Sequence, residues 1–404
     1  MEGPDTTMIG RLRSHTTKVA ALAVGLVLFA TSCASNAPQD TLEPEGPKAQ
    51  SIQNLVVPVF AVAGIVFVLV MGGALYVVWR FRARDDEDPE EFPEQIHGNF
   101  KLEIGWTILP AVVLLVIAVF TVATIFDLAE AAPEDSLDVE VIGQQWWWEY
   151  RYEVEVDGEM QEIITANDMV IPAGQEIQLH IKSNDVIHSW WAPRLNGKKD
   201  AVPGRTHLLT IEADEPGEYI GQCTEFCGLS HAEMRIKVVA MTPEDFDAWV
   251  TKQVQPFEAP TDEMAAAGFS TFASQCTTCH RIDGMTDPTD PSIEFEYPAV
   301  INQVSGNAPN LTKFMTRTTF AGAKFDLRLD TDECKALGED WAATPEGLDQ
   351  CFNRDALEAW LRNAPAEKAM YAGETPTPES RGMPNFNLSE DQIDELVEFL
   401  ITLQ

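Results

Sequence analysis

Two long apolar stretches dominate the first third of the chain. Residues 55–79 and 104–126 contain no charged side chain, and each is long enough to cross a bilayer as a helix. The segment between them carries several basic residues, namely Arg80, Arg82, Arg84 and Lys101, whereas residues 127–150 contain no Lys or Arg. Because basic residues remain on the cytoplasmic side, the pattern predicts a transmembrane hairpin over 55–126 with both ends outside.

The N-terminus has the pattern of an export signal. Basic residues precede an apolar run over 19–30 that is too short to span the hydrocarbon core, which favours a signal peptide (1–32) over a further spanning helix. Small residues directly precede Cys33, as in a bacterial lipoprotein signal, in which the cysteine becomes the lipidated first residue. Ordinary cleavage that leaves Cys33 free is the alternative. Residues 33–54 then form an extracytoplasmic segment.

Residues 134–254 follow a pattern of short strands. Alternating or β-branched runs such as 137–143 and 234–240 are separated by turns rich in Gly, Pro and Asp. Several short strands at this spacing predict an all-β sandwich or barrel. The region closes with a predicted helix, for which Thr242 can act as the N-cap and Pro243 suits the first turn.

The pattern becomes helical after a predicted linker over 255–263. Residues 264–404 contain amphipathic segments, and the last of them opens with Ser389 and Gln392 at the spacing of a capping box. Loops rich in Pro, Asp and Gly separate these segments. The sequence therefore predicts a multidomain membrane protein with a two-helix hairpin, an all-β domain and a mostly α-helical domain.

The charge balance is strongly acidic. The 404 residues include 64 acidic and 27 basic side chains, which gives a formal net charge of −37 at pH 7. Nucleic-acid binding needs a basic surface, so no nucleic acid is expected as a partner. The acidic side chains either keep the surface well solvated or steer a basic protein partner toward it.

Residues 276–280, CTTCH, have the pattern of covalent haem c attachment. The two thiols, Cys276 and Cys279, can each bond one vinyl group of the porphyrin, and His280 can bind the iron. A zinc site or a redox-active Cys-x-x-Cys pair is the alternative. The export signal, the adjacent histidine and the helical segment before the motif favour haem.

The sixth ligand of such a haem is expected to be a methionine. A thioether on the iron raises the reduction potential, which suits electron transfer. Met383, which lies before the last predicted helix, is preferred over Met370 and Met315.

Two of the seven cysteines have no role in a motif. Cys334 and Cys351 lie in the predicted helical domain, outside the cytoplasm. They can pair as a disulfide in an oxidising compartment. Free buried thiols are the alternative.

Residues 221–234, GQCTEFCGLSHAEM, bring soft donors together in one short segment, namely Cys223, Cys227, His231 and Met234. Thiolate, imidazole and thioether donors favour copper over calcium or magnesium. His188, which follows a predicted strand in NDVIHSWW, is the obvious further ligand. A zinc site, or a Cys223–Cys227 disulfide without metal, is the alternative.

The order of these motifs resembles subunit II of cytochrome c oxidase. After the two-helix hairpin come GQQWWWEY, NDVIHSWWAP, DAVPGR and CTEFCGLSHAEM. The appended CTTCH segment is similar to the caa3-type version, in which a cytochrome c is fused to this subunit. The resemblance runs from about residue 50 to the C-terminus. It implies a cupredoxin barrel with a CuA centre over 134–254 and a cytochrome c domain over 264–404.

The resemblance also implies the ligands of CuA, a centre of two copper ions. They are the side chains of His188, Cys223, Cys227, His231 and Met234 and the backbone carbonyl of Glu225. The two cysteines would bridge the coppers, and each histidine would bind one of them. The Glu225 carboxylate would also reach a magnesium ion at the interface with subunit I.

Two further residues have a role only through the resemblance. Trp146, in the run 146–148, matches the position at which electrons enter the copper domain, although GQQW stands here where GHQW is more usual. Glu103 matches a glutamate at the mouth of a proton pathway into subunit I. Core packing is the alternative for the tryptophans, and a carboxylate at the membrane boundary is the alternative for Glu103.

The implied function is electron transfer within a proton-translocating haem–copper oxidase of the bacterial cell membrane. Electrons from cytochrome c, or from a bc1-type complex, would pass through haem c and CuA to subunit I, which reduces O2 to water. Subunit I, other oxidase subunits and membrane lipid are the expected partners. A nitrous-oxide-reducing protein would need more than the seven histidines present. A quinol oxidase subunit would lack the copper ligands, and a copper chaperone would not need covalent haem.

Overall fold

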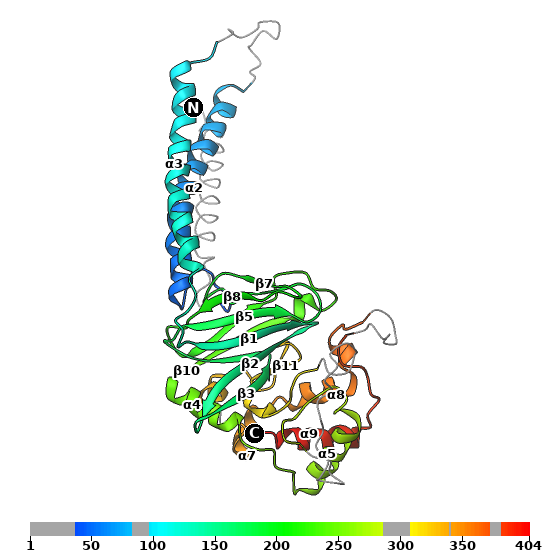
Figure 1. Cartoon of the computed structure of the whole chain (residues 1–404). Helices are drawn as coiled ribbons and strands as arrows, with labels where there is room; N and C mark the ends of the chain where they lie inside the picture. Colours follow the sequence, from blue (N-terminus) through cyan, green and yellow to red (C-terminus); the bar gives the residue numbers. More distant parts are fainter. Residues whose placement is uncertain (1–36, 83–96, 286–307, 339–340, 372–380) are drawn as a thin grey trace, which may run out of the picture.

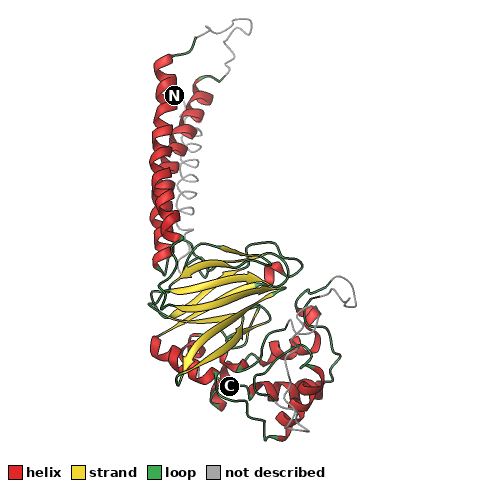
Figure 2. Ribbon diagram, in the orientation of Figure 1, coloured by secondary structure: helices red, strands yellow, loops and turns green. Residues whose placement is uncertain are grey.

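The chain folds into a long helical hairpin, a β domain and a helical C-terminal part (Figures 1 and 2). The structure is a computed structural model that describes residues 37–82, 97–285, 308–338, 341–371 and 381–404. The predicted signal peptide and the predicted lipidation site, Cys33, lie outside the described residues.

The hairpin consists of α2 (Pro47–Arg80) and α3 (Phe100–Leu128). Each helix has a mean hydropathy of 2.8 over its most apolar window, and no residue of that window is buried within the chain. The predicted spans are confirmed, although both helices are longer than the apolar runs. Because α2 begins at Pro47, the end of the predicted segment 33–54 belongs to this helix.

The hairpin is tied to the β domain at its outer end. The buried ammonium of Lys48, in the first turn of α2, donates a hydrogen bond of 2.9 Å to the carbonyl of Asp127 near the end of α3. The Glu45 N–H donates to the carbonyl of Arg194 in the β domain at 2.8 Å. The first bond joins the outer ends of the two helices, and the second fixes the segment before α2 to the β domain.

The β domain contains two main sheets, with strand orders β3-β2-β1-β5-β8 and β4-β10-β9. Each sheet combines antiparallel and parallel pairs, and apolar side chains from both sheets form one core. This architecture confirms the predicted all-β domain. The strands of the two sheets are β1 (Leu137–Gln144), β2 (Trp147–Val156), β3 (Glu159–Ala166), β4 (Asp168–Pro172), β5 (Ile177–Ser183), β8 (His207–Ile211), β9 (Gly217–Gln222) and β10 (Arg235–Met241). The short strands β6 (His188–Trp190) and β7 (Lys199–Ala201) pair at one edge of the domain.

The C-terminal part is mostly helical, as predicted. In α4 (Pro243–Gln253), which leads into it, the Thr242 side chain accepts the Asp245 N–H, and α9 (Glu390–Ile401) opens with the expected capping box. Its helices α5 (Glu263–Gln275) and α9 pack together over a core of Phe and Leu side chains, with α8 (Arg354–Glu367) beside α9. Two short helices, α6 (Asp332–Ala336) and α7 (Pro345–Cys351), are joined by a disulfide between Cys334 and Cys351.

Candidate metal centre and adjoining cavity

The segment 223–234, which we call the cysteine loop, connects β9 to β10. These strands pair antiparallel, so the two ends of the loop lie side by side. The N–H of Cys223 donates to the carbonyl of Met234 at 2.9 Å, and the short 3-10 helix η1 (His231–Glu233) turns the chain just before β10. The strand pair therefore brings the first and last donors of the loop to one place.

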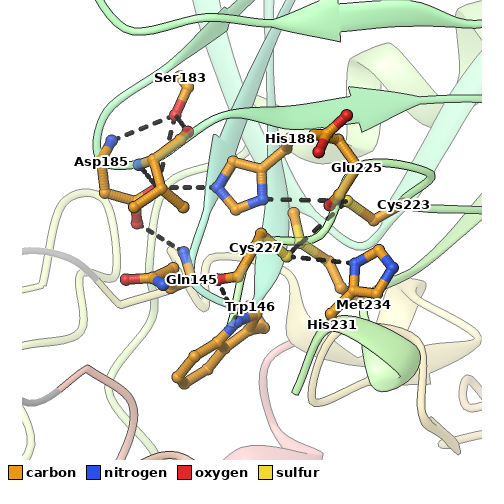
Figure 3. Close-up of polar contacts among 11 residues, drawn as sticks. Gln145, Trp146, Ser183, Asp185, His188, Cys223, Glu225, Cys227, His231 and Met234 are labelled. Carbon is orange, nitrogen blue, oxygen red and sulfur yellow. Dashed lines mark hydrogen bonds and ion pairs between the residues drawn. The ribbon is translucent and has the colours of Figure 1, made fainter. Parts of the chain in front are cut away.

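The two cysteine sulfurs lie at the centre of the site (Figure 3). They are 3.8 Å apart and do not form a disulfide. Around them, the Cys227 sulfur lies 3.5 Å from Nδ1 of His231 and 3.8 Å from the Met234 sulfur. The Cys223 sulfur lies 3.3 Å from the carbonyl oxygen of Glu225. Every predicted donor of the loop thus faces the sulfur pair.

His188 reaches the same centre from β6. Its Nδ1 lies 4.0 Å from the Cys223 sulfur, and the donor atoms of His188, Cys223 and Cys227 all lie within 4.8 Å of one another. On the other side of the ring, Nε2 is 2.8 Å from a carboxylate oxygen of Asp185. This bond fixes the ring and leaves Nδ1 directed at the sulfurs, as metal-binding histidines commonly are.

Charge at the site favours a thiolate beside an oriented histidine. The pKa of Cys223 is lowered to about 4, chiefly by the hydrogen bond from the Cys227 thiol, and also by His188. The pKa of Cys227 is raised, chiefly by its hydrogen bond to the Cys223 sulfur, and also by burial and by the negative charge on that sulfur. Burial lowers the pKa of His188, but its bonds to Asp185 and Cys223 outweigh this effect and leave it raised. Metal binding would deprotonate both thiols, and two thiolates in contact need a cation between them, so the donor set fits a soft metal centre.

Trp146 links this centre to a second site. It lies in the turn between β1 and β2, and its indole N–H donates to the carbonyl of Cys227 at 3.0 Å. The Gln145 side chain donates to the same carbonyl at 2.6 Å. Gly228 permits this approach, since a Cβ there would lie 3.0 Å from the indole ring. Its φ of +118° is also a backbone conformation that residues with a side chain rarely adopt. Trp146 also lines a cavity between the β domain and the helical part.

This cavity, of about 200 Å³, is predominantly apolar and is lined by all four predicted haem-binding residues, namely Cys276, Cys279, His280 and Met383. The His280 Nδ1 is 2.8 Å from the carbonyl of Pro309, which leaves Nε2 available as a ligand. Burial lowers the pKa of His280 and thus favours the neutral imidazole. Burial also raises the pKa of Cys276 to about 12, with a further contribution from Cys279.

The other predicted residues have different positions. Met370 lines the cavity as Met383 does, whereas Met315 packs in the core of the helical part. Glu103 lies in the first turn of α3, at the opposite end of the hairpin from the β domain (Figure 1). Glu225, within the cysteine loop, is exposed.

The structure adds two residues to the copper-type site that the sequence did not single out. Asp185 orients His188, and its only sequence signal is a carboxylate three positions before a candidate ligand. Gly143 lies against the ring of His188, where a Cβ would come within 2.7 Å of Cδ2. The role of Gly143 depends on a contact between distant segments, so spacing along the chain did not indicate it.

Trp147 and Trp148 differ in their surroundings. Trp148 is fully buried in the β-domain core and packs edge-on against His188, with ring centres 5.8 Å apart. Trp147 lines the cavity beside Trp146. Gln144, which stands in the less usual GQQW pattern, donates to Glu149 at 3.1 Å. The hydrogen bond to the cysteine loop is made by Gln145 instead.

Two thiols, two imidazoles and a thioether converge in this β sandwich, which is carried on a membrane hairpin. These features define a membrane-bound cupredoxin-like protein with a soft metal site. The family model for the cytochrome c oxidase subunit II periplasmic domain matches residues 137–241, and the model for the transmembrane domain of the same subunit matches residues 39–124. The chain belongs to the cytochrome c oxidase subunit II family.

Two relatives agree with this assignment by sequence. The cytochrome c oxidase subunit 2 of Alkalihalophilus pseudofirmus is 34% identical over 273 residues, which cover 66% of this chain and 78% of that protein. The corresponding subunit of Bacillus sp. strain PS3 is 31% identical over 339 residues, with 80% of each chain covered. The crystal structure of the periplasmic domain of subunit II (CoxB) of Bradyrhizobium japonicum is 31% identical. The matched region covers 30% of the present chain and 94% of the CoxB chain, with a TM-score of 0.27.

Family membership gives the protein its general role. It is a two-span membrane subunit of a haem–copper oxidase complex, with its β domain in the periplasm, and other oxidase subunits are its partners. The matched periplasmic domain is the copper-binding domain of this family, which agrees with the donor cluster on the cysteine loop.

Proposed function

We propose that this chain transfers electrons from a haem c in the cavity of its helical part to a CuA centre on the cysteine loop, and from there to subunit I. The observation that carries the proposal is the placement of Trp146. It lines the cavity together with the cysteines and histidine of CTTCH, and its indole N–H donates to the carbonyl of Cys227. One residue therefore touches both candidate redox sites.

The copper ligands in this proposal are the sulfur pair and the four groups around it. They are Cys223, Cys227, His188, His231, Met234 and the Glu225 carbonyl. When bound, the copper pair would accept and release single electrons, and the shared thiolates would spread the charge over both ions. Asp185 holds the His188 ring, and the β9–β10 pairing holds both ends of the loop. A preformed ligand set limits rearrangement when the charge changes. The exposed Glu225 carboxylate is free to meet magnesium at subunit I.

The haem ligands in this proposal are the residues of CTTCH and Met383. Cys276 and Cys279 would attach the porphyrin, and the Pro309 carbonyl orients His280 toward the iron. We assign residues 264–404 to a cytochrome c domain, residues 134–254 to the CuA domain and residues 255–263 to the linker. Met383 is preferred to Met370 as the sixth ligand because of its place before α9.

The remaining assignments concern the membrane and the donor. We propose a signal peptide at 1–32 with lipidation of Cys33, and a proton-pathway role for Glu103. An external cytochrome c or a bc1-type complex would supply electrons. The acidic side chains of the chain favour a basic docking surface on that donor.

The first experiment is to count metals in the purified oxidase that contains this chain, and to record the EPR spectrum of its oxidised copper. Two coppers that share one unpaired electron, together with one covalent haem c on this polypeptide, are expected. Zinc or no metal at the cysteine loop would contradict the proposal. Copper that a chelator removes readily from a chain without haem would instead support a copper chaperone.

A further inference from the structure

The β domain and the helical part meet at a seam that contains buried charged side chains from both, among them Asp168 and Lys368. From the β domain, the carboxylate of Asp168 accepts the N–H of Thr318 at 2.6 Å and the hydroxyl of Thr318 at 2.5 Å, and it also accepts the hydroxyl of Thr319. From the helical part, the ammonium of Lys368 reaches backbone carbonyls of the β domain. Both side chains are almost fully buried, with Asp168 2% exposed and Lys368 4% exposed.

Lys368 directly follows α8, and three carbonyl oxygens surround its ammonium. It donates to the carbonyl of Trp146 at 2.7 Å, to that of Ala321 at 2.7 Å and to that of Glu233 at 3.1 Å. An ammonium has three N–H donors and no acceptor, so every donor here has a partner. Burial lowers the pKa of Lys368 to about 7, and the nearby Glu233 carboxylate opposes this shift. The three carbonyls favour the protonated form.

The positions of the three acceptors give this lysine its significance. Trp146 is the residue that lines the cavity and bonds the carbonyl of Cys227, and Glu233 directly precedes Met234. Ala321 belongs to the cavity wall in the helical part. A single side chain therefore joins the cavity wall, the tryptophan and the end of the cysteine loop.

Neighbouring contacts leave little freedom for this arrangement. A Cβ on Gly322 would lie 2.4 Å from the Lys368 ammonium and 2.5 Å from the Trp146 carbonyl. The hydroxyl of Ser230, in the cysteine loop, donates to the carbonyl of Ala369. The segment after α8 is thus bonded to the loop at two successive residues.

We infer that Lys368 is a positioning residue, which holds Trp146 between the cavity and the cysteine loop at one fixed separation. The inference rests on the proposed function, because it needs a haem in the cavity and copper at the loop. The transfer that it serves is one electron, lost by the haem iron and gained by the copper pair, with no bond made or broken. A buried cation that only fastened the two domains would not need Trp146 as an acceptor.

The test compares Lys368→Met with Asp168→Ala in the purified oxidase. Each substitution removes one buried charge of the seam and leaves buried partners unsatisfied, but of the two residues only Lys368 contacts Trp146. The internal electron-transfer rate from haem c to copper is measured after photoreduction of the haem. Lys368→Met is expected to slow this step by about tenfold or more, and Asp168→Ala by less than about twofold.

Two further readouts show that the variants are comparable. Hydrogen exchange should increase at Arg235, whose N–H bonds Gly322, in the lysine variant, and at Thr318 in the aspartate variant. Copper and haem counts, the copper EPR spectrum and the haem absorption spectrum should match those of the wild type. An oxidase that lacks either metal group in the wild type contradicts the proposed function itself, independently of Lys368.

Equal slowing in both variants, or no slowing in Lys368→Met, would overturn the inference. If Lys368→Met does not assemble, Gly322→Ala provides the decision, because it keeps the charge but pushes the ammonium away from the Trp146 carbonyl. This variant should slow internal transfer severalfold with unchanged metal content. A wild-type rate in Gly322→Ala would contradict the role of Lys368.

Discussion

The two candidate redox sites are built in different ways. All donors at the cysteine loop except His188 come from residues 223–234, held between two paired strands. The cavity is lined by residues from α5, α8 and α9 and from the segments between them, and it is completed by β-domain residues that include Trp146 and Trp147. The first site depends on one local turn, whereas the second depends on the packing of a whole domain. The two sites should therefore fail separately.

The largest expected effect is the loss of copper in Cys227→Ser. This substitution removes a donor that faces His231 and Met234 as well as Cys223. Less than about one tenth of the copper should remain, because a hydroxyl is a poor ligand for soft metals. Copper analysis and EPR measure this loss, and covalent haem on the chain should be unchanged. Loss of haem in the same variant would show that the sites are not independent.

A second change should affect only the helical part. Replacing Cys334 and Cys351 together by Ala removes a disulfide whose cysteines are separated by 17 residues. The helical part should lose about 3 kcal/mol of stability, because the unfolded chain gains freedom. Thermal unfolding followed by haem absorbance measures the loss, and the copper EPR signal below the transition is the control. An unchanged unfolding temperature would rule out a stabilising role for this disulfide.

The smallest expected effect tests how local the copper-type site is. In Gly143→Ala, the new methyl group would press on the His188 ring, which is 2.7 Å away. Copper affinity should fall by roughly tenfold, as is typical when a residue that orients a ligand is changed. Competition with a copper chelator measures this affinity. Gly217→Ala on β9 is the matched control, because its Cβ would lie at an ordinary distance of 3.6 Å from Tyr219. Equal affinities in the two variants would contradict the expectation.

The sequence predicted the elements whose signals are local. The spans α2 and α3 follow from uninterrupted apolar runs, and the start of α9 follows from Ser389 and Gln392. The cysteine loop is likewise a short motif, so its donors could be identified from their spacing. The prediction stopped short at β2, because no strand was predicted over 147–156, and core packing of the tryptophans was left as an alternative to the electron-entry role of Trp146.

The residues that hold the sites in place could not be predicted in this way. Gly143 lies against the ring of His188, which belongs to a different strand. Lys368 bonds Trp146, which lies too far away in the sequence for any motif to include both. Their types, a glycine and a lysine, have no distinctive spacing. Their roles follow only from which surfaces the fold brings into contact. The same holds for Asp168, whose burial depends on Thr318 and Thr319.

The seam between the two domains also bears on kinetics. Because the two sites lie in one polypeptide and are packed together, each meets the other at a constant effective concentration. Such a concentration reaches the millimolar range even for parts that are joined only by short flexible linkers. Under the proposed function, the rate of the internal step would not change when the oxidase is diluted or when salt is added. Only the encounter with the external donor would remain a collision between two molecules, so all of the concentration dependence of electron delivery would lie at that outer step.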